Sequence, residues 1–147
     1  MSRPKITPPL ASPDDIEQQF YEALQAGDIE RLMAVWSDEE DITCVHPGGP
    51  RVVGAAAIRA AFESIFSNGA VNAHPEKVRR LQTHACSVHS VLEHIHLMMA
   101  QGPQSGWVIA TNVYVKGTQG WRLVAHHASP GSPRELQEMV EAAAVLH

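Results

Sequence analysis

The first half of the chain carries apolar residues at helical spacing. Ile16 and Phe20 begin a row of apolar positions four residues apart, as on the buried face of an amphipathic helix. Gly27 is expected to end this helix, because glycine readily adopts the left-handed conformation that closes helices. Similar spacing recurs over residues 29–36 and 58–66. The pattern therefore predicts three helices before residue 70.

From about residue 71 the pattern becomes typical of strands. Residues 77–99 interleave apolar and polar side chains and predict two strands with a turn near 83–86. Residues 107–116 and 121–129 predict two more, joined by a Gly-Thr-Gln-Gly hairpin turn. The glycine- and proline-containing segment 102–106 is expected to be a loop.

Two further strands of a few residues are expected among the helices. One ends at His46, just before a Pro-Gly-Gly-Pro turn, and the other is Arg51-Val52-Val53. We therefore expect an α+β fold over residues 14–131, with three N-terminal helices on one face of a curved antiparallel sheet. An extended arm over residues 1–13 and a C-terminal tail helix over 132–147 would flank this domain.

Composition narrows the class of protein. The 147 residues, 44% hydrophobic and 18% charged, fit a single globular domain. A net charge of −5 with scattered Lys and Arg argues against nucleic-acid binding, and no apolar run suits a membrane span or a secretory signal. Cys44 and Cys86 lie in apolar runs and are expected to be reduced thiols. These features predict a cytoplasmic protein.

Short motifs then suggest a family. Four segments carry the resemblance: F-Y-E-A-L-Q-A-G-D in the first helix, V-W-S-D-E-E-D-I-T-C-V-H-P-G-G-P, A-T-N-V-Y-V, and G-W-R-L-V-A-H-H-A-S in the last strand. With them the chain resembles the SnoaL-like, ketosteroid-isomerase-like branch of the nuclear-transport-factor-2-like superfamily. The resemblance runs from about Asp14 to Pro130. It implies a cone-shaped domain with a pocket between helices and concave sheet, a homodimer formed through the outer face of the sheet, and no metal or other cofactor.

The resemblance also implies where catalytic groups would lie. The isomerase's tyrosine falls at Phe20, its proton-transferring aspartate at His46, and the aspartic acid of its oxyanion hole near Asn112. One of these roles is lost and two are chemically altered, so the isomerase's own reaction is not expected. Tyr21, one helical step from Phe20, is expected to be rotated by about 100° away from the pocket-facing position.

Three residues are the candidate catalytic groups. His46 titrates near neutral pH and would act as general base, and Asn112 would hold a carbonyl or enolate oxygen. His127 shares a face with Trp121 by strand alternation, so it is expected to point inward as a second acid or an orienting group, with His126 pointing outward. The alternative for both histidines is a structural role, satisfied by one hydrogen bond.

Five further residues are expected to contact the ligand. These are Phe20, Tyr114, Trp36, Phe62 and His94. His94 and His96 have the H-x-H spacing of metal ligands, with Glu93 on the opposite strand face. A pocket-lining or structural role is preferred for the pair, and no metal site is predicted.

Two functions from different classes remain open. The first is a cofactor-independent isomerase, lyase or cyclase that moves protons on a small apolar carbonyl compound. The second is a non-catalytic ligand-binding or dimerisation module. Loss of the family's tyrosine and both carboxylates favours the second, whereas the histidines expected to point inward favour the first. The sequence does not identify a substrate.

Overall fold

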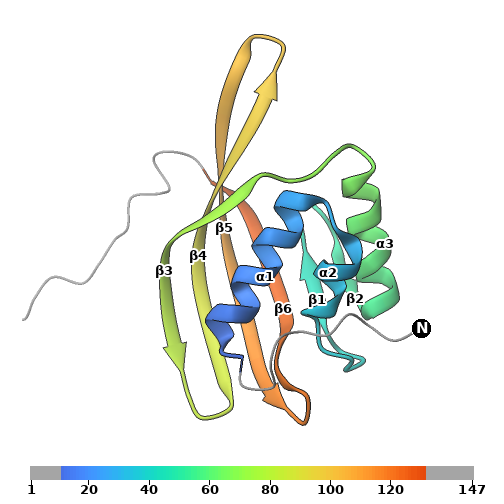
Figure 1. Ribbon diagram of the computed structural model, residues 1–147, viewed down its shortest axis with the longest axis vertical. Helices are drawn as coiled ribbons and strands as arrows, with labels where there is room; N and C mark the ends of the chain where they lie inside the picture. The colour runs from blue at the N-terminus through green and yellow to red at the C-terminus, as the bar shows by residue number, and fades with distance from the viewer. Residues whose placement is uncertain (1–10, 132–147) are drawn as a thin grey trace, which may run out of the picture.

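The structure is a computed structural model that describes residues 11–131 (Figure 1). Its helices are α1 (Pro13–Ala26), α2 (Ile29–Ala34) and α3 (Ala55–Phe66). The start of α1 is a capping box, in which the Ser12 hydroxyl accepts from the Asp15 N–H and the Asp15 carboxylate accepts from the Ser12 N–H. Gly27 ends α1 with φ 64°, as the sequence predicted, and Asp28 caps α2.

Six strands form one sheet in the order β2-β1-β6-β5-β4-β3. They are β1 (Thr43–Val45), β2 (Arg51–Val53), β3 (Ala73–Gln82), β4 (Cys86–Met99), β5 (Gly102–Gly117) and β6 (Gly120–Gly131). The expectation of a fully antiparallel sheet is wrong, because β1 pairs parallel to β6. The other four pairs of neighbouring strands, including the β1–β2 hairpin, are antiparallel.

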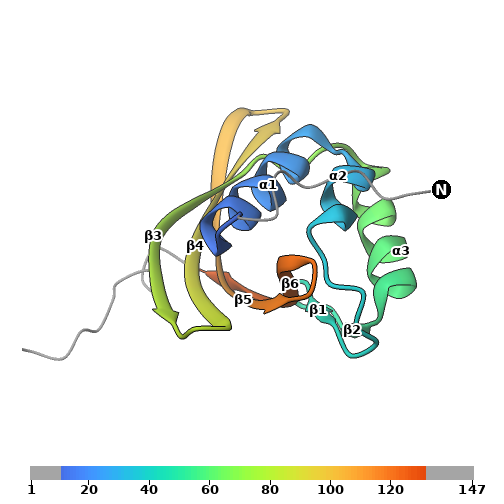
Figure 2. The same ribbon diagram turned by 60° about the horizontal axis from the view of Figure 1, so that its bottom comes forward.

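The described helices all lie on one side of the sheet, which curves around them (Figure 2). The main core fills the space between the two layers and contains Phe20, Leu32, Trp36, Ile58 and Phe62. The proposed N-terminal arm falls largely, and the tail helix entirely, outside the described residues. Within the described part, no helix is long and apolar enough to cross a membrane.

The far ends of β4 and β5 extend beyond the rest of the sheet (Figure 1). In this segment, residues His96–Met99 pair with Gly102–Ser105, and we call it the ribbon. The prediction of a loop over 102–106 is therefore wrong. Glycine and proline are depleted in strands, but Pro103 is tolerated here because β5 has no further neighbour at this point in the described chain.

A β-bulge interrupts the pairing of β5 with β6. Val113 lies opposite Ala125 and Tyr114 opposite Leu123, which leaves Val124 as an extra residue in β6. The extra residue reverses the alternation of β6 beyond it. His126 is consequently 5% exposed, on the inner face, whereas His127 is exposed. The predicted orientations of these two histidines are both wrong, for this one reason.

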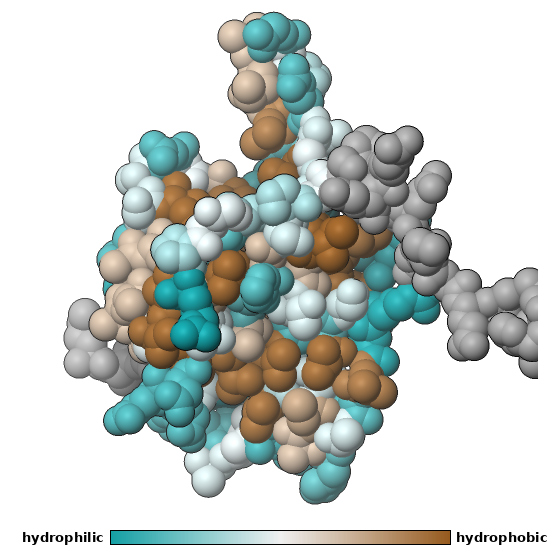
Figure 3. Space-filling model, turned by 180° about the vertical axis from the view of Figure 1, so that it is seen from behind, coloured by the Kyte–Doolittle hydropathy of each residue, from teal (hydrophilic) through white to brown (hydrophobic). Residues whose placement is uncertain are grey.

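No described helix covers the outer face of the sheet. Viewed from the side opposite to Figure 1, the molecule shows apolar patches interspersed with polar ones (Figure 3). Large apolar side chains exposed on the molecule include Val53, Leu81, Leu97, Met98 and Met99. The polar groups on the inner face, by contrast, are almost completely buried.

Candidate functional site

Seven polar side chains meet on the inner face of the sheet beneath α1. We call them the inner network, and they are Glu17, Tyr21, His89, Glu93, Asn112, Tyr114 and His126. Each is at most 5% exposed. Burying polar groups costs free energy unless they are hydrogen-bonded, so a cluster of this size requires matched donors and acceptors.

The Glu17 carboxylate is the main acceptor of the inner network. Its Oε2 accepts from the Tyr114 hydroxyl at 2.7 Å and from Asn112 Nδ2 at 3.2 Å, and His89 Nδ1 lies 3.0 Å away. All three contacts use Oε2, and no hydrogen bond to Oε1 joins it to another described residue. Glu17 therefore keeps one carboxylate oxygen for a further partner.

Asn112 joins the separate parts of the network. Its Nδ2 donates to both Glu17 and the hydroxyl oxygen of Tyr21, the latter at 3.0 Å. Its Oδ1 lies 2.5 Å from His126 Nδ1, so this imidazole nitrogen carries the proton. Burial, with smaller effects of nearby His46 and His127, lowers the pKa of His126 to about 3, which keeps the ring neutral.

Tyr21 links the network to a second carboxylate. Its hydroxyl donates to Glu93 Oε2 at 2.6 Å. Burial is the main cause that raises the pKa of Glu93 to about 7, helped by the nearby Glu17 charge and opposed by the Tyr21 hydrogen bond. Burial likewise holds the pKa of Tyr21 well above its usual value, so Tyr21 remains a donor at neutral pH. The Tyr21–Glu93 pair can therefore gain or lose a proton near neutrality.

Regular periodicity brings these residues together. Glu17 and Tyr21 are four apart on α1 and so share one helix face. Asn112 and Tyr114 are two apart on β5 and share the inner face of the sheet. His89 lies opposite Asn112 on β4, which sets the two strands' polar groups side by side.

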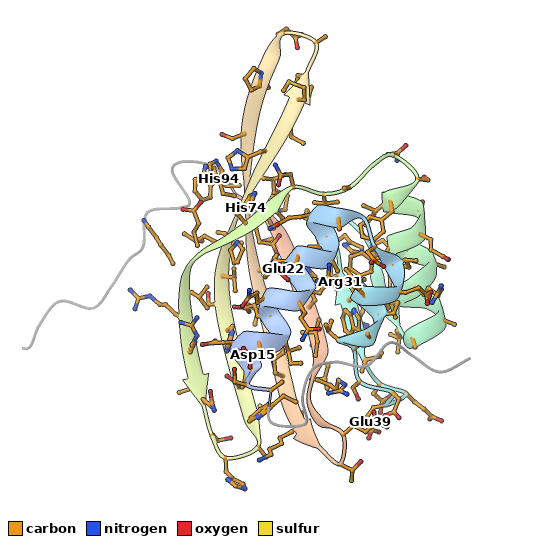
Figure 4. The ribbon with its side chains drawn as sticks, viewed as in Figure 1. Asp15, Glu22, Arg31, Glu39, His74 and His94 are labelled. Atoms are coloured by element: carbon orange, nitrogen blue, oxygen red, sulfur yellow. The ribbon has the colours of Figure 1, made fainter. Side chains whose placement is uncertain are left out.

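A cleft of about 440 Å³ lies between α1 and β3 and reaches the inner network. Glu17 and Tyr21 line it, together with exposed side chains of α1 such as Gln18 and Glu22. Arg80 lines the opposite wall and pairs with Asp14 at 2.7 Å. Figure 4 shows Glu22 on α1 beside Arg31 of α2, its ion-pair partner. Glu17 and Tyr21 are nevertheless almost completely buried, so the cleft lies against the inner network without exposing it.

His46 lies outside the inner network. Its ring meets Phe62 edge to face at 4.8 Å, and its Nε2 lies 3.7 Å from Cys44 Sγ. Its ring centre is 6.5 Å from that of His126, with no hydrogen bond between them in the described chain. Burial lowers the pKa of His46, so it is neutral at physiological pH and keeps the form required of a base.

The other predicted residues divide between the network, the core and the outer face. Asn112 and Tyr114 belong to the network, whereas Phe20 and Phe62 pack edge to face in the core. Trp36 is also buried and lines a different cavity, of about 270 Å³, between α2 and α3. His127 and His94 do not reach the network.

His94 belongs instead to a group on the outer side of the sheet. It stacks on Trp107 at 4.1 Å, lies 3.2 Å from a Glu76 carboxylate oxygen, and is 22% exposed. His96 lies between it and His74, with ring centres 4.3 and 5.2 Å away, and we call these three the outer histidines. Figure 4 shows His74 and His94 where the ribbon leaves the sheet. Among residues 11–131, no three His, Cys, Asp or Glu side chains are placed to hold a metal ion.

Sequence reasoning missed most of the carboxylates and donors of the inner network. Glu17, His89 and Glu93 were not predicted as site residues, and Tyr21 was expected to point away from the pocket. A signal existed: Glu17 and Tyr21 lie on the same helix face as Leu24, so the apolar stripe contains two polar residues. His89 and Glu93 similarly flank Val91 on the buried face of one strand.

These features define an α+β pocket domain, and comparison with known proteins identifies its family. The sequence profile of the SnoaL-like domain matches residues 14–133, and the chain belongs to this family, within the nuclear-transport-factor-2-like superfamily. No curated protein matches the chain. The predicted family is thereby confirmed.

Three solved structures show how the fold recurs. A protein of Thiobacillus denitrificans, provisionally assigned as a calcium/calmodulin-dependent protein kinase type II association domain, is 31% identical, with 85% of this chain and 99% of that chain covered and a TM-score of 0.77. A provisionally assigned dehydratase of the NTF2-like family from Streptomyces avermitilis is 27% identical over 80% and 92%, with a TM-score of 0.70. The CaMKII hub of S. rosetta, 19% identical over 82% and 98% with a TM-score of 0.65, shows the shared fold alone.

Proposed function

We propose that the protein is a cofactor-independent enzyme that moves a proton on a small carbonyl compound bound in the α1–β3 cleft. The observation that carries this proposal is that Glu17 and Tyr21, two almost completely buried members of the inner network, line the cleft. A carboxylate and a hydroxyl in one water-poor site supply a proton acceptor and an oxygen-binding donor. The similarity to a provisionally assigned dehydratase is consistent with this chemistry.

Glu17 is the proton acceptor in this proposal. Three donors hold its Oε2 in place, which orients the carboxylate and leaves Oε1 for the substrate's C–H proton. Asn112 and Tyr114 are therefore positioning residues, because they act on the substrate through Glu17. This assignment replaces His46 as the base and removes any need for His127.

Tyr21 is the oxygen-binding donor, and Glu93 supplies its proton. When Glu93 is protonated, its own O–H can donate to the Tyr21 oxygen, which frees the Tyr21 hydroxyl to donate to a substrate oxygen. The raised pKa of Glu93, about 7, makes this form abundant at and below neutral pH. Activity is accordingly expected to fall as pH rises through about 7.

The test requires no knowledge of the natural substrate. Cyclohexanone, acetophenone and 4-hydroxy-2-butanone are incubated with the protein in D₂O, and loss of the protons next to the carbonyl is followed by ¹H NMR. We expect exchange above the buffer rate for at least one ketone, and a loss of about 100-fold in Glu17→Gln, as is usual when a general base is removed. Glu22→Gln is the matched control, since Glu22 is an exposed cleft carboxylate on the same helix. Exchange that is absent for all three ketones, or equal in Glu17→Gln, would refute the proposal.

A second function, assembly with other copies, is favoured by the 31% identity to a provisionally assigned association domain. The outer face of the sheet, which no described helix covers, is the surface on which we place a homodimer contact. The substitution Val113→Asp places a charge at the centre of this face. It is expected to shift the mass measured by multi-angle light scattering towards that of the monomer. An unchanged mass would exclude the contact.

A further inference from the structure

Most of the ribbon is supported by no other described part of the protein. Pairing between β3 and β4 ends with Ala73 opposite Ile95, and β6 ends at Gly131, opposite Trp107. Beyond these points, residues 97–105 pair only with one another and with His96 among the described residues, and His96 keeps one backbone hydrogen bond outside the ribbon, to Asn72. A lone two-stranded hairpin is marginally stable in water, so this extension requires a further contact.

Three large apolar side chains of the ribbon are exposed beside uncharged polar ones, and the ribbon carries no Asp, Glu, Lys or Arg. Leu97 is 47% exposed, Met98 82% and Met99 45%. Residues 96–106 contain no Asp, Glu, Lys or Arg. Edge strands that remain free usually carry charges that prevent association, and their absence here indicates that the ribbon is normally covered.

The two edges of the ribbon differ in their ability to pair. On the β5 edge, Pro103 has no N–H to donate. On the β4 edge, the His96 N–H donates to the Asn72 carbonyl of the segment before β3. Because donors alternate along a strand, the Met98 N–H points to this same side, where β3 is no longer present. The β4 edge is therefore the one open to another strand.

We propose that the β4 edge of the ribbon, Leu97–Met99, pairs antiparallel with the same edge of a second copy of this chain. A two-fold axis through such a pair lets each copy satisfy the other's Met98 N–H and brings the apolar side chains together. A second copy can pair with this edge because the edge carries no charge, whereas two identical charged edges would repel each other. The contact differs from the outer-face contact proposed above and does not depend on the cleft.

The first test measures mass by multi-angle light scattering across a series of protein concentrations. Met98→Pro removes the edge N–H, and Leu97→Asp places a like charge on both copies. Each is expected to weaken association by about tenfold or more, an ordinary effect of a disrupted interface centre. Val53→Asp is the matched control, because Val53 is 46% exposed on the edge strand at the other side of the sheet. Circular dichroism confirms that each variant is folded.

A crosslinking test fixes the geometry. With the two-fold axis near residue 98, Met98→Cys treated with diamide gives a disulfide-linked dimer on a non-reducing gel, whereas Gln104→Cys on the β5 edge does not. A wild-type protein that is monomeric at all concentrations overturns the proposal. So does a mass that responds to Val113→Asp but to neither ribbon variant, since the sheet face would then be the contact.

Discussion

The inner network and the outer histidines are two places in the described chain where titratable side chains gather, and they differ in what holds them. In the inner network, Glu17, Asn112 and Tyr21 are linked by hydrogen bonds and are almost completely buried. Among the outer histidines, His94 stacks on Trp107 and lies beside a partly exposed carboxylate. Burial shifts the pKa values of Tyr21, Glu93 and His126 in the network. Burial and directed hydrogen bonds, rather than the number of histidines, therefore distinguish a candidate site.

Removal of Glu17 is the strongest test of this difference. Glu17→Ala leaves the donors of His89, Asn112 and Tyr114 buried without their shared acceptor, which is expected to cost about 3 kcal/mol or more of unfolding free energy. Urea denaturation of Glu17→Ala and of Glu22→Ala, whose carboxylate is solvated, measures the contrast. Equal losses in the two variants would mean that the network adds nothing to stability.

Replacement of Glu93 tests the effect of burying a carboxyl group. Its folded-state pKa of about 7 lies above the unfolded value, so the native protein holds the proton more tightly. The contribution of Glu93 to stability should therefore fall as pH rises from about 4.5 to about 7, by up to ~1.4 kcal/mol per pH unit, in the opposite direction to the contribution of His126. In Glu93→Gln this loss should disappear. Denaturation at a series of pH values measures it, and parallel pH profiles for the two proteins would contradict the assignment.

His126 should give the opposite dependence on pH. Its folded-state pKa, about 3, is below the unfolded value, so its contribution is present above about pH 6.5 and is lost as pH falls. His126→Gln, which can still donate to Asn112, should therefore lose less stability than the wild type between pH 6.5 and 4. The difference expected is about 1–2 kcal/mol, discounted for relaxation of the acidified protein. If the variant lost as much stability at low pH as the wild type, protonation of His126 would not cost the folded protein any stability.

The smallest effect is expected among the outer histidines. His94→Ala removes an aromatic stack and a partly exposed ion pair, which together contribute about 1 kcal/mol or less. Its thermal unfolding should lie within a few degrees of the wild type. A loss as large as that of Glu17→Ala would remove the distinction between the two regions.

The fold was largely predictable, because it follows from local patterns. The helices were predicted from the spacing of apolar residues and from capping residues such as Gly27. Most of the strands were predicted from the alternation of apolar and polar residues. Segment 102–106 was the exception, since its glycines and proline suggested a loop. The parallel pairing of β1 with β6 was not predictable either, because it depends on a contact between segments far apart in sequence.

The site was predictable only in part. Asn112 was found because asparagine is unusual in the middle of a strand, and Tyr114 because it shares the strand face of Asn112. Glu17 and Glu93 were missed because a carboxylate in an amphipathic element is usually solvated. Their burial depends on donors from other segments, β4 and β5 for Glu17 and α1 for Glu93. Tyr21 was misplaced because the rotation of α1 about its axis is set by packing rather than by its sequence.

The bulge at Val124 has a consequence for anyone who would modify β6. The additional residue reverses the alternation of β6. Odd-numbered positions face inward before the bulge, and even-numbered positions face inward after it. Deleting Val124 would restore regular alternation in β6, with Ala125 still opposite Val113 and His126 still opposite Asn112, so His126 would remain on the inner face. The extra residue therefore shifts the phase of the sequence along β6 and leaves the pairing of the two histidines unaffected.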